Sequence, residues 1–146
     1  MFEKQSIKIV VSVLTLVVIS GSCFASNRRD LVDQGVVSLE RQHSKKVHIA
    51  WSNVRQDGEG IVVSGVLMRH AITSYPIWRH VEVTVLAPDG TVLQEARTSD
   101  IQVPRRVPGR GFNTKRFEVR FPGIPPRGSL VRISLCDKNS CSKEVK

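Results

Sequence analysis

Short alternations of apolar and polar residues, separated by turn residues, constrain the fold of this chain more than any other feature. In the stretch HVEVTVL, residues 80–86, the valines are separated by single polar residues, and RFEVRF, residues 116–121, repeats the pattern with phenylalanine and valine. Successive side chains of a strand point to opposite faces of a sheet. Each stretch therefore predicts a strand with one buried face.

The same alternation begins near residue 46. Val47, Ile49 and Trp51 occupy every second position and are predicted to share the buried face of a first long strand. DGEG at residues 57–60 and PDG at residues 88–90 combine residues that favour turns, so each predicts a hairpin connection. Residues 99–114 contain two prolines and two glycines and are predicted to form the longest loop.

Together these segments predict an all-β domain, residues 46–146, folded as a single small β-sandwich of about seven antiparallel strands. HVEVTVLAPDGTVLQEA, followed by FEVRFPGIPPRGSLVRISL, resembles the strand-turn-strand pattern of bacterial periplasmic immunoglobulin-like or fibronectin-III-like domains. That resemblance implies a protein that binds, adheres or assembles, and the implication comes from the fold alone.

The amino terminus has the pattern of a secretory signal. Lys4 and Lys8 precede an apolar run over residues 9–19, which is too short to span a bilayer and is followed by small residues up to Ala25. We expect a signal peptide at residues 1–25 and a periplasmic or secreted protein. In an alternative interpretation Cys23 is lipidated. Residues 26–45 fit a linker, a short helix or a first edge strand.

Two cysteines near the carboxyl end are predicted to form a disulfide. Cys136 and Cys141 are separated by four residues, which suits two cysteines facing each other across a turn. An oxidising compartment favours the bond. A redox pair normally has two residues between its cysteines, and a zinc site needs further ligands, so both of these functions are disfavoured.

The chain is strongly basic. Its formal net charge is +9, and removal of Glu3, Lys4 and Lys8 with the signal lowers this to +8. Such a charge attracts anionic polymers, lipid headgroups or acidic proteins without choosing among them. From Arg105 to Arg132 there are eight basic residues and one acid, and arginine suits bidentate contacts to phosphate or carboxylate.

The leading hypothesis is therefore a binding module for an anionic envelope polymer or a protein partner. Its candidate contact residues are Arg105, Arg106, Arg110, Lys115, Arg116 and Trp78. Arg116, Arg120 and Arg132 fall on outward positions and would form one basic face if their strands are neighbours. The alternative is a solvated basic surface without a partner.

Trp78 and His80 have the same outward parity as Glu82 in the strand pattern. The indole of Trp78 is therefore either exposed for contact with a partner or bent back to cap the core, and capping is the commoner role of such a tryptophan. Met68, His70 and His80 bracket one loop, and their thioether and imidazole groups suit copper. Periplasmic metal handling is thus a second hypothesis. The third is a structural or assembly role, in which an exposed edge strand pairs with a partner strand.

Enzyme and cofactor motifs are missing from the sequence, so we expect a non-enzymatic protein without a cofactor. Export disfavours a nucleic-acid partner, although basic residues with a tryptophan are compatible with one. Contact with a membrane is expected only if Cys23 carries lipid.

Overall fold

The chain is an all-β protein in a computed structural model, which describes residues 29–70, 75–105, 109 and 114–136. Eight strands and no helix occur among these residues. The strands are β1 (Val37–Gln42), β2 (Val47–Asp57), β3 (Gly60–Arg69), β4 (Ile77–Leu86), β5 (Val92–Arg97), β6 (Ile101–Val103), β7 (Thr114–Pro122) and β8 (Ser129–Cys136). The described part of the chain accordingly contains no helix that could cross a membrane.

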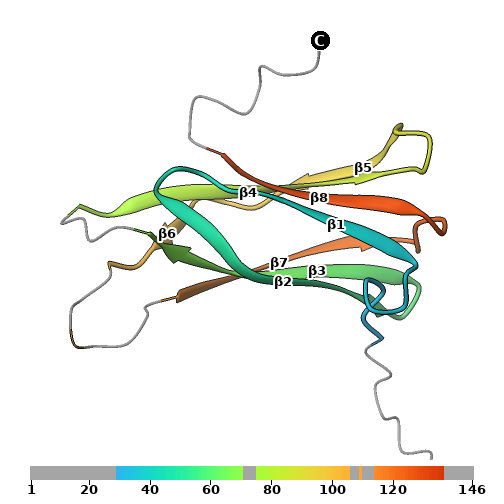
Figure 1. Cartoon of the computed structure of the whole chain (residues 1–146), viewed down its shortest axis with the longest axis horizontal. Helices are drawn as coiled ribbons and strands as arrows, with labels where there is room; N and C mark the ends of the chain where they lie inside the picture. The colour runs from blue at the N-terminus through green and yellow to red at the C-terminus, as the bar shows by residue number, and fades with distance from the viewer. Residues whose placement is uncertain (1–28, 71–74, 106–108, 110–113, 137–146) are drawn as a thin grey trace, which may run out of the picture.

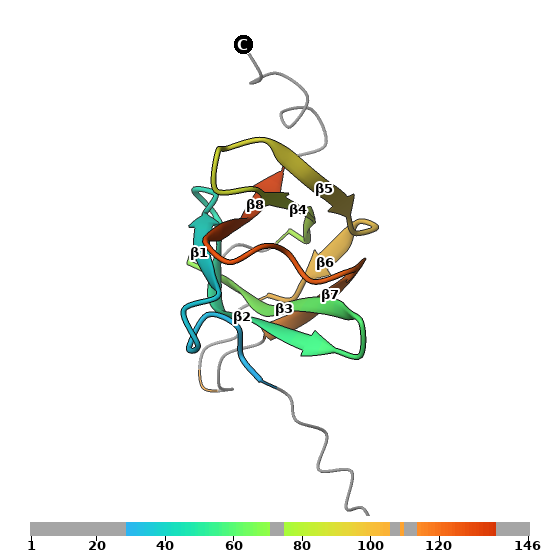
Figure 2. The same cartoon turned by 90° about the vertical axis from the view of Figure 1, so that its right-hand side faces the viewer.

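The strands form two sheets that pack face to face (Figure 1). One sheet has the order β1-β8-β4-β5, with the short β6 also paired to β4. The other has the order β2-β3-β7 and is antiparallel throughout. Seen along the strands, the two sheets lie one above the other, with β6 near the side of the three-stranded sheet (Figure 2). The predicted two-layer architecture is therefore confirmed at the level of an all-β sandwich.

One strand pair departs from the predicted antiparallel arrangement. Strand β1 runs parallel to β8, from Val37 beside Ser129 to Gln42 beside Ser134. The structure has eight strands where about seven were predicted, and the prediction that all of them are antiparallel was wrong for this pairing. Residues 26–45, for which three structures were open, contain this edge strand.

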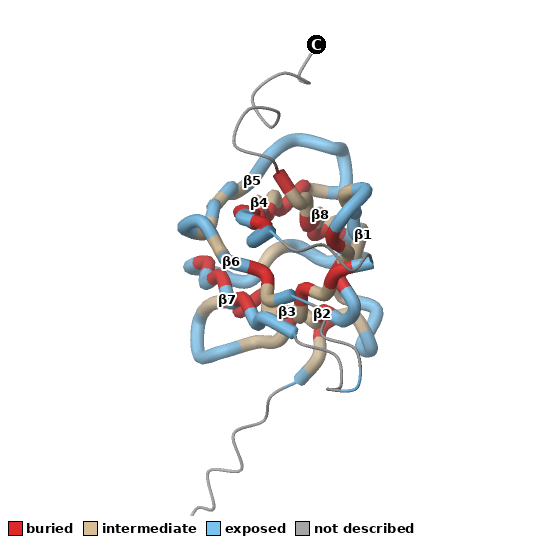
Figure 3. The backbone as a smooth tube through the Cα atoms, turned by 90° about the vertical axis from the view of Figure 1, so that its left-hand side faces the viewer, coloured by how far each residue is buried: buried red, intermediate tan, exposed pale blue. Residues whose placement is uncertain are grey.

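The core lies between the two sheets, where the predicted alternations place their apolar residues (Figure 3). Val81, Val83 and Val85 of β4 are fully or almost fully buried. Phe117, Val119 and Phe121 of β7 are buried from the opposite sheet, while the residues between them are exposed. These two strands confirm the inward faces that their sequences predict.

Trp51 does not lie on the buried face, contrary to the prediction. The register of β2 and β3 shifts between Ile49 and Trp51, which leaves Ala50 as an extra residue in a β-bulge. An extra residue reverses the face of every position after it, because side chains alternate along a strand. Consequently Ser52 is buried, while Trp51 is 51% exposed.

The predicted loop over residues 99–114 contains structure. Residues Ile101–Val103 form β6 and pair with Ile77–Arg79 of β4, and residue 114 begins β7. Just before β6, Asp100 lies 3.5 Å from Nδ1 of His80. His80 is only 1% exposed, although its position in the alternation predicted an outward side chain.

Candidate functional site

Positively charged residues gather at one end of the sandwich, on the left in Figure 1. This end is formed by the β1–β2 turn, the end of β3, the start of β4, the end of β6 and the start of β7. Residues 43–46, 69–70, 75–79, 102–105 and 114–115 in these segments include no acid. We call it the basic end, and its cations are Lys45, Lys46, Arg69, Arg79, Arg105 and Lys115.

A buried arginine holds this end together. Arg69 is the last residue of β3 and follows Leu67 on the inward face, where it is 2% exposed. Its Nε and one terminal nitrogen donate to the carbonyl oxygen of Val103, at 3.1 and 2.7 Å, and the other terminal nitrogen donates to that of Tyr75, at 3.1 Å. One guanidinium thereby ties β3 to the start of β4 and the end of β6.

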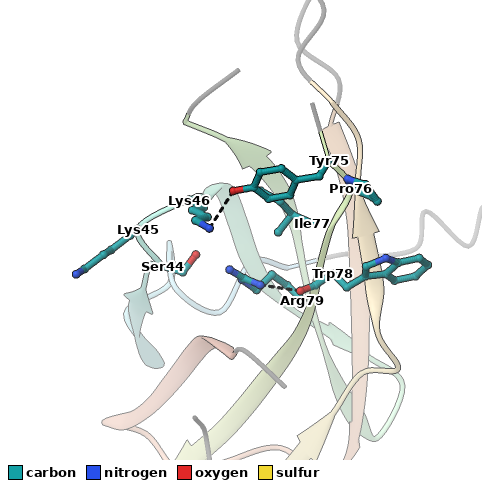
Figure 4. A pocket seen from close by; sticks show the side chains of 8 residues that line it. All are labelled: Ser44, Lys45, Lys46, Tyr75, Pro76, Ile77, Trp78 and Arg79. Carbon is teal, nitrogen blue, oxygen red and sulfur yellow. Dashed lines mark hydrogen bonds between the residues drawn. The ribbon is translucent and has the colours of Figure 1, made fainter. Parts of the chain in front are cut away.

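A pocket of about 320 Å³ opens beside this arginine and is lined by Ser44–Lys46 and Tyr75–Arg79 (Figure 4). Nζ of Lys46 donates to the hydroxyl of Tyr75 at 3.1 Å and lies 5.3 Å from the centre of its ring. Arg79, 8% exposed, donates to the carbonyl oxygen of Trp78 at 2.8 Å. The pocket is at the small end of the range for ligand sites, and three cations and no carboxylate line it.

Such a lining favours an anion. Ammonium and guanidinium groups supply only donors, and bonds from them to carboxylate or phosphate oxygens are stronger than bonds between neutral groups. The partial burial of Arg79 reduces solvent screening of its charge. The arrangement can therefore hold a carboxylate, phosphate or sulfate group.

The structure brings together some of the candidate contact residues. Arg105 follows β6 at the basic end, and Lys115 continues the inward positions of β7 at the same end. Arg106 and Arg110 lie outside the described residues. Arg116 faces outward on the three-stranded sheet, beside Val66, and therefore belongs to a different surface.

Trp78 is 45% exposed, so the structure does not support its role as a core cap. Its indole lies on the opposite side of β4 from Lys46 and Arg79 and points away from the pocket (Figure 4). Trp78 is adjacent to Gln102 of β6 in the strand register. Trp78 is thus one of the residues that line the pocket, but its indole is directed away from Lys46 and Arg79.

The predicted continuous face of Arg116, Arg120 and Arg132 is not formed. Strand β7 carries the first two on the three-stranded sheet, whereas β8 carries Arg132 on the other sheet. Arg132 is also paired with Glu40 at 3.0 Å. Alternation alone cannot show which sheet a strand joins, so the sequence could not exclude this face.

Sequence analysis missed the pocket residues of the β1–β2 turn and the start of β4. Lys45 and Lys46 are adjacent cations directly before a predicted strand, and this pair was a detectable signal. Arg79 carried no comparable signal, because an arginine next to a tryptophan is typical of an ordinary surface position. Only the packing of β4 against the β1–β2 turn brings these side chains together.

The residues of the metal hypothesis belong to different sheets: Met68 is in β3, His70 directly follows β3, and His80 is in β4. His70 instead stacks on His48, with ring centres 4.1 Å apart. His43 contacts the ring of His48 edge-on, with ring centres 6.4 Å apart. Among the described residues no group of three histidine, cysteine or acidic side chains is placed to hold a metal ion.

Two histidines have altered pKa values. Burial lowers the pKa of His48, and the neighbouring His70 and His43 lower it further. Burial and the adjacent Arg97 lower the pKa of His80, against the opposing effect of Asp100. Both side chains are therefore neutral at pH 7.

The remaining predicted modification sites lie at the ends of the chain. Cys136 is the last residue of β8 and is buried, while Cys141 and Cys23 are outside the described residues. The disulfide between Cys136 and Cys141 and the lipidation of Cys23 thus remain predictions.

Comparison of the chain with protein-family models, curated protein sequences and solved structures finds no match in any of the three.

Proposed function

We propose that this chain is an exported, non-enzymatic binding module whose basic end recognises an anionic polymer or an acidic protein surface of the cell envelope. The observation that carries the proposal is the convergence of cations from five separate segments that contain no acid. The pocket lined by Lys45, Lys46 and Arg79 gives this charge a defined place to hold an anionic group.

Export and fold family belong to the same proposal. The signal pattern of residues 1–25 supports a periplasmic or secreted location, where a disulfide between Cys136 and Cys141 would form. The two-layer packing supports the immunoglobulin-like or fibronectin-III-like resemblance. The strand order differs from antibody constant domains, in which the second and third strands lie in different sheets, because β2 and β3 form one hairpin.

The test compares two charge reversals of equal size. Lys45 at the basic end and Arg127 in the β7–β8 turn are both exposed, and neither has a hydrogen bond or ion pair within the described residues. We expect Lys45→Glu to weaken binding to polyglutamate and polyphosphate roughly fivefold or more, since one cation at an anionic surface contributes about 1 kcal/mol. Arg127→Glu should leave binding nearly unchanged.

Equal losses in the two variants would show that only net charge matters, and the assignment of the basic end would then be abandoned. Intact mass spectrometry of the exported protein tests the rest of the proposal, because it reports the cleavage site, lipidation of Cys23 and oxidation of the cysteines.

A specific observation also favours assembly through a sheet edge. Strand β5 is the last strand of its sheet, and Val92 and Leu93 on it are 59% and 44% exposed. A partner strand could add to this edge by backbone hydrogen bonds. Disulfide trapping through Val92→Cys, compared with Ser38→Cys on β1, should capture a partner at β5 only; equal capture at both edges would reject this candidate.

A further inference from the structure

A groove crosses the outer face of the three-stranded sheet, away from the pocket at the basic end. It has a volume of about 580 Å³, within the range of ligand sites. The strand register sets Trp51 of β2 beside Val66 of β3, and Val66 beside Arg116 of β7. Because neighbouring strands are about 4.8 Å apart, the Cα atoms of Trp51 and Arg116 lie roughly 10 Å from each other across the groove.

Trp51 forms one wall of this groove through the β-bulge at Ala50. The bulge turns the indole from the core to the outer face, where it is 51% exposed. A half-exposed tryptophan leaves a large apolar area open to solvent and commonly marks a contact site. The ring gives a flat apolar surface for a ligand of similar shape.

Arg116 forms the other wall and differs from the arginines farther along the same face. Arg55 is paired with Glu118 at 3.1 Å, and Arg120 is paired with Asp57 and Glu118 at 2.9 and 2.8 Å. Arg116 is exposed and has no hydrogen bond or ion pair within the described residues. The donor groups of its guanidinium therefore bond to no described residue and can bind an anionic ligand.

The next row of side chains is polar and carries both donors and acceptors. The hydroxyl of Ser64 donates to Oδ1 of Asn53 at 2.6 Å, and Ser64 also lies beside Glu118 in the register. Ser64 and Glu118 line the groove with Trp51 and Arg116. The carboxylate of Glu118 is paired with Arg55 and Arg120, and its oxygens can also accept hydrogen bonds from hydroxyl groups of a ligand.

From this juxtaposition we infer that the groove binds a uronic acid residue of an acidic glycan. The sugar ring stacks on the indole of Trp51, its carboxylate binds Arg116, and its hydroxyls bond to Ser64 and Glu118. A sugar ring has apolar C–H faces together with hydroxyl groups, so it matches each wall of the groove. The inference concerns a site separate from the basic end and holds independently of the proposed function.

The test uses the fact that the chain has two tryptophans, Trp51 and Trp78. In the Trp78→Phe variant the only indole is in the groove, and a galacturonate trisaccharide should change its fluorescence saturably. The neutral galactose trisaccharide should bind at least about tenfold more weakly, because a charge-assisted bond to Arg116 is missing. In the Trp51→Phe variant the remaining indole is beside the basic end, so a fluorescence change in that variant reports binding there and not in the groove.

Two arginine substitutions complete the experiment in the Trp78→Phe chain. Arg116→Gln should weaken galacturonate binding roughly tenfold, while Arg127→Gln, the matched exposed control, should leave it unchanged. Equal affinity for the neutral sugar, no effect of Arg116→Gln, or no fluorescence change would overturn the inference. Tighter binding of oligothymidylate or pentaglutamate than of galacturonate would overturn it in favour of a nucleic acid or a peptide.

Discussion

The two ends of the sandwich are built from the same strands but close in opposite ways. At the basic end, inward positions of β3, β4 and β7 hold Arg69, Arg79 and Lys115, beside the buried Ile77 of β4. At the other end, called the hairpin end and formed by the turns at residues 57–60, 87–91 and 122–128, Ile61 and Phe121 occupy the inward positions. The apolar core thus reaches both ends, and at the basic end cations share its inward positions.

The charges of the two ends are also used differently. At the hairpin end Arg120 is paired with both Asp57 and Glu118, so its charge is balanced inside the protein. The segments that form the basic end contain no acidic residue of their own. Cations held close together repel one another and reduce stability, and a bound anion would relieve this repulsion. The proposed role of the basic end as a binding surface rests on this difference.

Removal of the buried arginine should have the largest effect. Arg69→Met deletes three hydrogen bonds and leaves the carbonyls of Val103 and Tyr75 without that donor. We expect a loss of about 2–4 kcal/mol in the free energy of unfolding, measured by urea denaturation, together with weaker polyanion binding. Lys115→Met at the same end should change stability by less than about 0.5 kcal/mol. Similar losses in both variants would contradict the role given to Arg69.

A smaller effect is expected from overpacking the hairpin end. A methyl group at Gly60 would collide with the backbone carbonyl of Phe121, so Gly60→Ala should cost about 1–3 kcal/mol of stability. Gly58→Ala meets no atom within 4 Å and should cost only about 1 kcal/mol, from its positive φ of 61°. Binding of polyglutamate to the Gly60→Ala variant should match that of the parent protein. Loss of binding would show that the two ends are not independent.

Acidification should act through histidines outside the hairpin-end turns, which contain none. Burial lowers the pKa values of His48 and His80, so below about pH 6.5 the unfolded chain binds these protons more readily than the folded one. Stability should hold above pH 6.5 and fall as the pH drops from there toward the lower folded-state values. The slope is at most about 1.4 kcal/mol per pH unit for each histidine.

The His80→Gln variant checks this assignment. Thermal unfolding followed from pH 7.5 to pH 5 should show a shallower decline in stability than in the parent protein. An unchanged slope would mean that His80 does not contribute to the acid sensitivity.

The smallest effect is expected from the exposed ion pairs. Arg120→Gln removes the links to Asp57 and Glu118, and surface pairs of this kind contribute about 0.2–1 kcal/mol. Its loss of stability should shrink as salt concentration rises, because salt already screens the pairs in the parent protein. A loss above 2 kcal/mol would show that the pairs hold the hairpin end closed.

The fold was predictable where the burial pattern of a strand follows from the sequence of that strand alone. Val81, Val83 and Val85 alternate without interruption, and their burial follows from the period of a strand. Trp51 was misplaced because the bulge at Ala50 depends on pairing with β3, which leaves no mark in the sequence of β2. The parallel pairing of β1 with β8 joins segments more than ninety residues apart, and no local pattern can specify such a contact.

The candidate site was predictable only in part, for the same reason. Arg105 and Lys115 drew attention because basic residues are dense near them in the sequence. Lys46 and Arg79 come from distant segments and meet only in the folded chain. Arg69 bonds to Val103, and His80 lies near Asp100. Because these partners come from another segment, alternation within one strand could not predict that Arg69 and His80 are buried.

Amide chemical-shift mapping of the ¹⁵N-labelled protein during titration with polyglutamate tests the central claim most directly. The shifts should be confined to the basic end, above all to residues 44–46, 75–79 and 103–105, and should weaken as salt is added. Shifts spread equally over the turns of the hairpin end, or an absence of saturable shifts, would contradict the assignment of the basic end as the binding surface.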